Sequence, residues 1–147
     1  MNGVGRYVSF VIAIAFGLFA GCSQSGPKYV TVSGKVTLKD GTPVKHGNII
    51  FQPDQKRGNA SQVICQSVIR DGEYTIRTGE KVGAPLGTYR VLIEAPLQPD
   101  EKNPYFTKWF AHEKYMNPER SKLTVDVAEQ PEPGQYDFKL DPPIKRK

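Results

Sequence analysis

The sequence contains few of the residues from which enzyme sites and disulfide scaffolds are built. Its 147 residues include two cysteines, two histidines and one tryptophan. Two cysteines are too few for a disulfide-built scaffold. The histidines, His46 and His112, have no metal-ligand spacing beside them, so we expect no metal site. No Gly-x-Ser-x-Gly motif is found and no carboxylate pair stands out as acid and base, so we expect no enzyme activity and no cofactor.

Charge of one sign is also scarce. Lys and Arg number 20 against 15 Asp and Glu, and the formal net charge of +5 is spread along the chain. Such a mild excess does not indicate a nucleic acid partner. Residues 142–147 are interpreted as a solvated basic tail. Asp40, Asp54 and Asp71 stand in turn contexts, and we expect them to cap turns rather than to bind calcium.

Long hydrophobic runs are absent except for one near the amino terminus. From Tyr7 to Ala20 this run has about 14 residues, or roughly 21 Å as a helix, which is short of the ~30 Å hydrocarbon core of a bilayer. Arg6 is the single charged residue before it. The run is therefore typical of the central region of a signal peptide rather than of a membrane span.

The run ends in Leu18-Phe19-Ala20-Gly21-Cys22, which resembles a bacterial lipobox. In that family of signals a diacylglyceryl group is attached to the Cys thiol and a peptidase cuts just before it. The resemblance implies a cleaved lipoprotein signal peptide at residues 1–21, then the lipidated Cys22 and a tether at residues 22–28. It also implies stable anchoring at the periplasmic or outer face of a bacterial membrane. An ordinary secretory peptide with a coincidental cysteine is the alternative.

Cys65 then has no intramolecular partner. It lies in a run of β-branched residues, where a free cysteine usually behaves as a small buried hydrophobe. Nothing nearby in the sequence resembles an activating base, so we do not expect a nucleophilic thiol.

The rest of the chain alternates apolar and polar residues with the period of two that is typical of half-buried strands. Seven such segments are predicted, at residues 29–38, 48–52, 62–70, 73–77, 88–94, 123–127 and 135–140. Gly34 is expected to be a bulge or a site of close approach. Asp71-Gly72 is a strong hairpin signal. Because no long amphipathic helix is evident, we predict an all-β fold, an antiparallel two-sheet sandwich.

The predicted core is formed by the apolar members of these strands. It consists of Val32, Val36, Leu38, Ile49, Phe51, Val63, Cys65, Tyr74, Ile76, Tyr89, Val91, Ile93, Val125, Val127 and Phe138.

The order of strands and turns resembles the transthyretin-like, carboxypeptidase-regulatory-like domains. The matching pieces are a Gly-x-Val strand, a Gly-x-Pro turn, an apolar strand, Asp-Gly-x-Tyr and Gly-x-Tyr-x-Val, at residues 34–36, 41–43, 47–51, 71–74 and 87–91. The resemblance implies a seven-stranded antiparallel Greek-key sandwich over residues 29–141. Residues 113–125 are similar to a segment of small envelope lipoproteins of planctomycete-type bacteria. Together these resemblances imply a non-catalytic, lipid-anchored structural or binding module with no established activity.

One enzyme with the transthyretin fold hydrolyses 5-hydroxyisourate with paired histidines, an arginine and a carboxy-terminal Tyr-Arg-Gly-Ser. This chain ends Pro143-Ile144-Lys145-Arg146-Lys147 and lacks that tail. A cryptic hydrolase is therefore the least favoured function.

The connection at residues 97–121 shows no strand alternation, and long connections are often functional. Its aromatic and imidazole side chains are Tyr105, Phe106, Trp109, Phe110, His112 and Tyr115. One interpretation is a platform at residues 105–115 that binds carbohydrate or peptide. The favoured one is a helical turn in which Phe106, Trp109 and Phe110 cap an open end of the sandwich. Besides the membrane, the candidate partners are envelope polysaccharide and other envelope proteins, through the aromatic loop or exposed strand edges.

Overall fold

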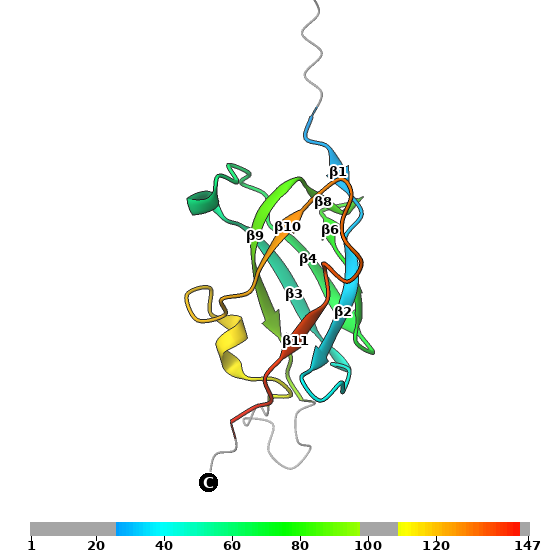
Figure 1. Cartoon of the computed structure of the whole chain (residues 1–147), viewed down its shortest axis with the longest axis vertical. Coiled ribbons are helices and arrows are strands. Elements are labelled where there is room, and N and C mark those ends of the chain that lie inside the picture. Colours follow the sequence, from blue (N-terminus) through cyan, green and yellow to red (C-terminus); the bar gives the residue numbers. More distant parts are fainter. Residues whose placement is uncertain (1–25, 98–108, 145–147) are drawn as a thin grey trace, which may run out of the picture.

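The computed structural model describes residues 26–97 and 109–144, which form an all-β domain (Figure 1). The strands are β1 (Tyr29–Val30), β2 (Ser33–Leu38), β3 (His46–Pro53), β4 (Cys65–Arg70), β5 (Glu73–Thr75), β6 (Arg77–Thr78), β7 (Lys81–Val82), β8 (Ala84–Pro85), β9 (Gly87–Glu94), β10 (Thr124–Val127) and β11 (Phe138–Leu140). Two 3-10 helices, η1 (Gln55–Arg57) and η2 (Glu113–Met116), lie in connections. Within these ranges, no helix has the length and apolarity that a membrane span requires. The predicted signal peptide, Cys22, Tyr105, Phe106 and the last three residues lie outside the described residues.

Most of the strands belong to one long sheet that curls around the core. Its order is β10-β9-β3-β4-β5-β2-β11, with β6 paired to β4 and β7 paired to β6, while β1 and β8 form a separate two-stranded sheet. All pairs are antiparallel except β11 with β2, which is parallel and sets Phe138 opposite Val36. The expectation of a purely antiparallel fold is therefore wrong for this pair. A period of two fixes the faces of a strand and carries no information about its direction.

The seven predicted segments all contain strands, but the described chain has further short ones. Residues 77–85 form β6, β7 and β8, each only two residues long. Two residues are too few to show an alternating pattern in the sequence. The predicted third strand begins late, at Cys65, so Val63 lies in the connection before it with 43% of its surface exposed. Its assignment to the core is wrong, whereas the other predicted core residues are buried.

The core is centred on four aromatic rings. Phe51 lies 5.8–6.3 Å, between ring centroids, from the rings of Tyr74, Tyr89 and Phe138, in tilted and edge-on arrangements that favour aromatic packing. The two tyrosines of this group each donate a hydrogen bond to a backbone carbonyl. Tyr74 Oη donates to Tyr136 O at 2.6 Å and Tyr89 Oη donates to Pro85 O at 2.8 Å.

Gly34 is a site of close approach, as the sequence predicts. A Cβ atom added there would lie 2.1 Å from the carbonyl oxygen of Tyr136. Beside it, Lys35 N donates to Asp137 Oδ1 at 2.8 Å. The segment that leads from β10 to β11 therefore crosses over the beginning of β2. The predicted hairpin turn is also confirmed, since Asp71 and Gly72 both have positive φ, 49° and 82°, as a tight two-residue turn requires.

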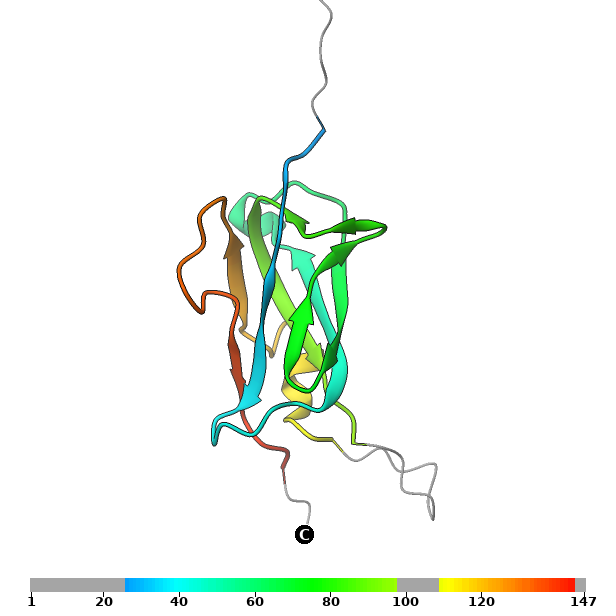
Figure 2. The ribbon, with the colours of Figure 1, turned by 90° about the vertical axis from the view of Figure 1, so that its right-hand side faces the viewer.

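The strand ends define two poles of the domain (Figure 2). At the N-terminal pole β1 begins, β3 ends, and β4 and β9 begin, because Pro53 pairs with Tyr89 and Phe51 with Cys65. At the distal pole β9 ends, the turn at residues 71–72 closes, and residues 109–116 follow. The chain therefore enters the domain at one pole and leaves β11 toward the other.

Candidate functional site

The described part of the predicted aromatic platform lies at the distal pole. Trp109 forms an isolated bridge with Pro96, and Phe110 N donates to Ala95 O at 2.8 Å. Both side chains are half-buried, and Phe110 packs against the core. The helix of this segment, η2, begins only at Glu113, so Trp109 and Phe110 are not part of a helical turn. The predicted turn is wrong for these two residues because their backbone pairs with Ala95 and Pro96, directly after β9, instead of forming a helical turn.

His112 is used as a helix cap. Its Nδ1 accepts a hydrogen bond from Lys114 N at 3.0 Å, which satisfies one of the unpaired amides at the start of η2. Its backbone N–H donates to Asp141 O at 3.0 Å. The other histidine, His46, begins β3, and its buried Nε2 has no hydrogen-bond partner among the described residues. Within residues 26–97 and 109–144, no three His, Cys, Asp or Glu side chains are grouped so that they could hold a metal ion.

Asp141, the residue after β11, forms hydrogen bonds with Lys114 and Tyr115 of η2. Its carboxylate accepts hydrogen bonds from Lys114 Nζ and from Tyr115 Oη, the latter at 2.9 Å, and it lies 2.5 Å from Lys39 Nζ. The hydrogen bonds from Lys114, Lys39 and Tyr115 hold the pKa of Asp141 well below its usual range. Tyr115 is 4% exposed and also accepts from Asp141 N at 3.0 Å. Tyr115 is therefore buried and His112 is occupied as a helix cap, whereas Trp109 and Phe110 are the described aromatic residues of the platform that are partly exposed.

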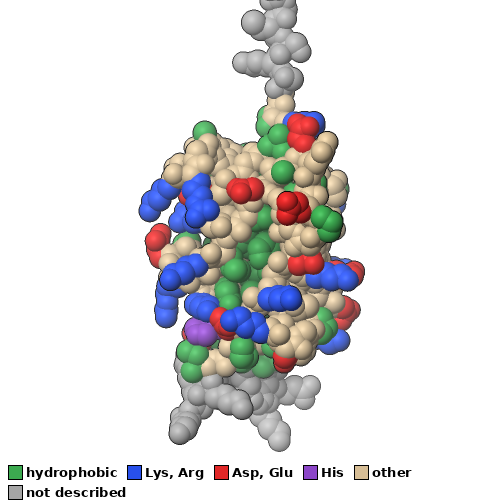
Figure 3. Space-filling view, viewed as in Figure 1, with side chains coloured by type: hydrophobic (Ala, Val, Ile, Leu, Met, Phe, Trp, Pro, Cys, Tyr) green, Lys and Arg blue, Asp and Glu red, His purple; other side chains and the backbone are tan. Residues whose placement is uncertain are grey.

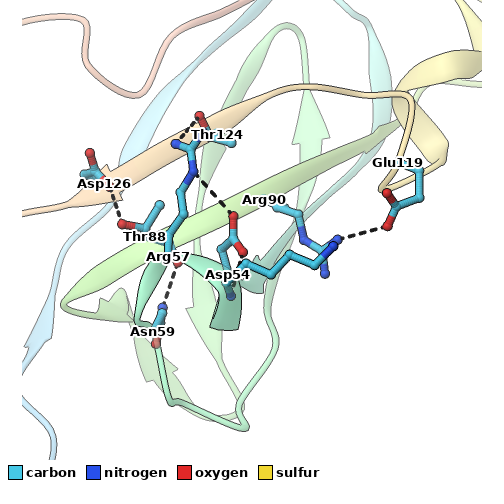
Figure 4. Close-up of polar contacts among 9 residues, drawn as sticks. Asp54, Arg57, Asn59, Thr88, Arg90, Glu119, Thr124 and Asp126 are labelled. Carbon is cyan, nitrogen blue, oxygen red and sulfur yellow. Dashed lines mark hydrogen bonds and ion pairs between the residues drawn. The ribbon is translucent and has the colours of Figure 1, made fainter.

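A second polar cluster lies where η1 meets β9 and β10 (Figure 4). Asp54, whose side chain is 8% exposed, accepts from Lys56 N at 3.1 Å and pairs with Arg57 Nε at 3.7 Å. Arg57 Nη1 in turn donates to Thr124 Oγ1 at 3.4 Å. Asp54 thus caps η1, as expected from its turn context, and Asp40 likewise accepts from Thr42 N. These bonds tie the connection after β3 to the edge strand β10.

Arg90 is the least satisfied member of this cluster. Its Nη1 lies 3.5 Å from Glu119 Oε1, a long contact to a carboxylate that is 75% exposed, and its Nε is buried without a hydrogen-bond partner among the described residues. Arg90 lines a hollow of about 340 Å³ together with Gln52, Asp54, Gln55, Lys56 and Ser61. Amides, a hydroxyl and two cations at one place can bind a carboxylate, a phosphate or a hydroxyl-rich group. The sequence does not reveal this hollow because its residues come from separate segments, each with an ordinary strand or turn pattern.

The outer face of the sheet carries two wider, shallower hollows. One of about 650 Å³ lies over β2, β5 and β4, and one of about 620 Å³ lies over β3 and β4; they share Ser67, Val68 and Arg70. On the face of Figure 1, Lys and Arg side chains gather mainly along the side that carries β9, with apolar side chains in the middle (Figure 3). The exposed surface therefore offers shallow polar grooves that suit an extended ligand more than a small enclosed one.

Cys65 is fully buried at the beginning of β4, as expected for a small hydrophobe. Burial raises the pKa of its thiol, so the reactive thiolate is disfavoured.

None of the family models, curated proteins and solved structures compared with this chain matches it. Its function is therefore inferred from its own residues.

Proposed function

We propose that this protein is a non-catalytic module of the bacterial cell envelope, held at the periplasmic or outer face of a membrane by acyl chains on Cys22. One observation carries the proposal: an apolar run at residues 7–20, the small-residue step Gly21-Cys22 and a folded domain follow one another within a few residues. The domain begins with Tyr29, seven residues after Cys22. An acylated Cys22 would therefore hold the domain close to the membrane surface.

The first residues of the domain, Lys28 to Val30, contact other parts of the fold, which suits a point of attachment. Tyr29 and Val30 pair with Pro85 and Ala84. Lys28 forms an ion pair with Glu129 at 2.8 Å, and Lys81 Nζ lies 4.5 Å from the centre of the Tyr29 ring. Several weak contacts together thus join residues 28–30 to three separate parts of the fold.

The test is the intact mass of the protein purified from its native membrane fraction. We expect the mass of residues 22–147 plus two or three acyl chains, and no acyl mass on the Cys22→Ser variant. An unmodified chain, or a disulfide between Cys22 and Cys65, would refute the lipoprotein assignment. Alkylation after unfolding distinguishes these cases because a lipidated Cys22 leaves one reactive thiol and the disulfide leaves none.

The same proposal includes a transthyretin-like Greek-key sandwich of seven main strands over residues 29–141. Its support is the motif order in the sequence together with the curl of the long sheet. Gln135 Nε2 donates to Asp126 O at 2.6 Å, so the connection to β11 contacts the opposite edge strand, β10. An experimental structure with two packed layers is expected. A single open sheet would contradict this fold assignment.

A second candidate function is binding of carbohydrate or peptide by residues 105–115. It is favoured by the partly accessible rings of Trp109 and Phe110 at the distal pole, the end that faces away from the attachment point. Aromatic faces in such a position can stack on sugar rings. We expect Trp109→Ala to abolish binding to an array of bacterial polysaccharides while the melting temperature stays unchanged. Val82→Ala, on a 48% exposed side chain of β7, is the control that should retain binding.

The cryptic hydrolase has the least support. His112 Nδ1 is occupied as a cap, which removes one nitrogen from acid–base chemistry. Turnover of an ester or amide substrate that is lost in both His46→Ala and His112→Ala would be needed to revive this alternative.

A further inference from the structure

Four exposed aliphatic side chains lie at the N-terminal pole. They are Val63, Ile64, Val82 and Leu86, with 43%, 53%, 48% and 39% of their surface exposed. Val63 and Ile64 directly precede β4, Val82 ends β7, and Leu86 separates β8 from β9. A single exposed aliphatic residue on a soluble domain is ordinary, but several at one end indicate a surface that contacts something apolar.

The strand register brings these residues to the same end although they come from three connections. Cys65, next to Ile64, pairs with Phe51 near the end of β3. Val82 pairs with Arg77, and Pro85, next to Leu86, pairs with Tyr29 at the start of β1. All three connections therefore lie near the point at which the chain enters the domain, which Figure 2 shows at the pole opposite the end of β11.

The chain between this pole and Cys22 is short. From Cys22 to Tyr29 there are seven residue steps, and a fully extended chain spans at most about 3.6 Å per residue, so the two are no more than about 25 Å apart. An acylated Cys22 lies at the membrane surface. Such a short tether gives the pole a high effective concentration at the bilayer surface. Even weak contacts between the pole and the lipid can therefore form.

We propose that the N-terminal pole is a membrane-contact face, with Val63, Ile64, Val82 and Leu86 resting in the headgroup region of the bilayer that holds the anchor. This inference rests on the proposed lipid anchor and adds an orientation to it. Its consequence is that the distal pole, with Trp109 and Phe110, points away from the membrane.

Charge contributes little to this contact. The cations at or next to the pole are Lys28, Lys56, Arg57, Arg77 and Lys81, and the anions are Asp54, Glu80, Asp126 and Glu129. Two of the cations are already paired, Lys28 with Glu129 and Arg57 with Asp54. With the signs nearly matched, the attraction is apolar, and it should depend weakly on salt and on anionic lipid.

The test measures depth in the membrane with the lipidated protein in phosphatidylcholine vesicles. Leu86→Cys and Val82→Cys are each labelled with an environment-sensitive fluorophore, and Met116→Cys, 38% exposed at the distal pole, is the matched control. Buried Cys65 and acylated Cys22 should not take the label. We expect nitroxide-bearing lipids to quench the labels at positions 82 and 86 at least threefold more than the label at 116. The difference should persist between about 0.05 and about 0.5 M salt.

The outcomes separate the two proposals. The intact mass of each preparation shows whether Cys22 is acylated. An acylated protein with equal quenching at positions 82, 86 and 116 would overturn the contact face and leave the anchor intact. A preparation without acyl mass would overturn the anchor and, with it, the contact face. Melting temperatures of the labelled variants within a few degrees of the parent exclude unfolding as the cause of quenching.

Discussion

Replacing Gly34 with alanine tests the crossing of the connection between β10 and β11 over β2. The Cβ atom of the alanine would lie 2.1 Å from the oxygen and 2.7 Å from the carbon of the Tyr136 carbonyl. Both neighbours are backbone atoms, so no flexible side chain can turn away. Gly34 is not among the positions of positive φ, and the alanine backbone itself is therefore unstrained. The loss of stability should therefore come entirely from displacing the segment between β10 and β11 that carries Tyr136.

The expected loss is about 2–4 kcal/mol. Overpacking of a tight site typically costs about 1–3 kcal/mol. The displaced carbonyl also accepts the buried hydrogen bond from Tyr74 Oη, and weakening it adds about 1 kcal/mol. For a domain of this size, about 3 kcal/mol corresponds to a fall of roughly 10 °C in melting temperature.

Urea unfolding followed by circular dichroism measures the difference directly. Gly26→Ala is the control, because nothing lies within 4 Å of a Cβ atom at Gly26. The control should match the parent chain. If the free energy of unfolding of Gly34→Ala were also within about 0.5 kcal/mol of that of the parent chain, the segment between β10 and β11 would not cross β2 at Gly34.

Three further predictions follow from the titratable groups. Because the pKa of Asp141 is held below that of an unfolded aspartate, about 3.9, its carboxylate stabilises the fold above that pH and the effect is lost as the pH falls further. Asp141→Asn should therefore lower stability by about 1–2 kcal/mol at pH 7 in urea titrations, and a difference of the same size at pH 2 would contradict this. Cys65 should resist iodoacetamide at pH 8 in the folded protein and react after unfolding; rapid alkylation of the native chain would show that the thiol is not buried as described. Burial raises the pKa of Tyr89 to about 12, so its ultraviolet titration should be displaced above pH 10, and the stability it contributes should decline from about pH 10 upward. Ionisation at an ordinary pH near 10 would contradict that burial.

The alternating pattern predicted most of the fold because it reports burial directly. Buried apolar residues recur at every second position of these strands, as Val36 and Leu38 do in β2 and Ile49 and Phe51 do in β3. That pattern is the one expected of a strand with one buried face. The glycine at position 34 and the Asp71-Gly72 pair were also informative, since each satisfies a backbone requirement that few other residues meet. These features depend on neighbours in the sequence.

Features that depend on distant segments were not predictable in this way. The parallel pairing of β11 with β2 joins residues about 100 positions apart, and no local pattern encodes it. The same is true of Asp141, whose interactions with Tyr115 and Lys39 decide that Tyr115 packs inward rather than lining a platform. The hollow beside Arg90 is assembled from separate segments and was missed for the same reason.

The pairing of β11 with β2 also sets an order of events during synthesis. A polypeptide that is synthesised from its amino terminus presents β2 early and β11 about 100 residues later. The sheet cannot acquire its last strand until residue 140 has emerged, and until then the edge of β2 is open to other chains. Until then the domain is an incomplete sheet, and a variant truncated just before Phe138 would keep that edge exposed indefinitely.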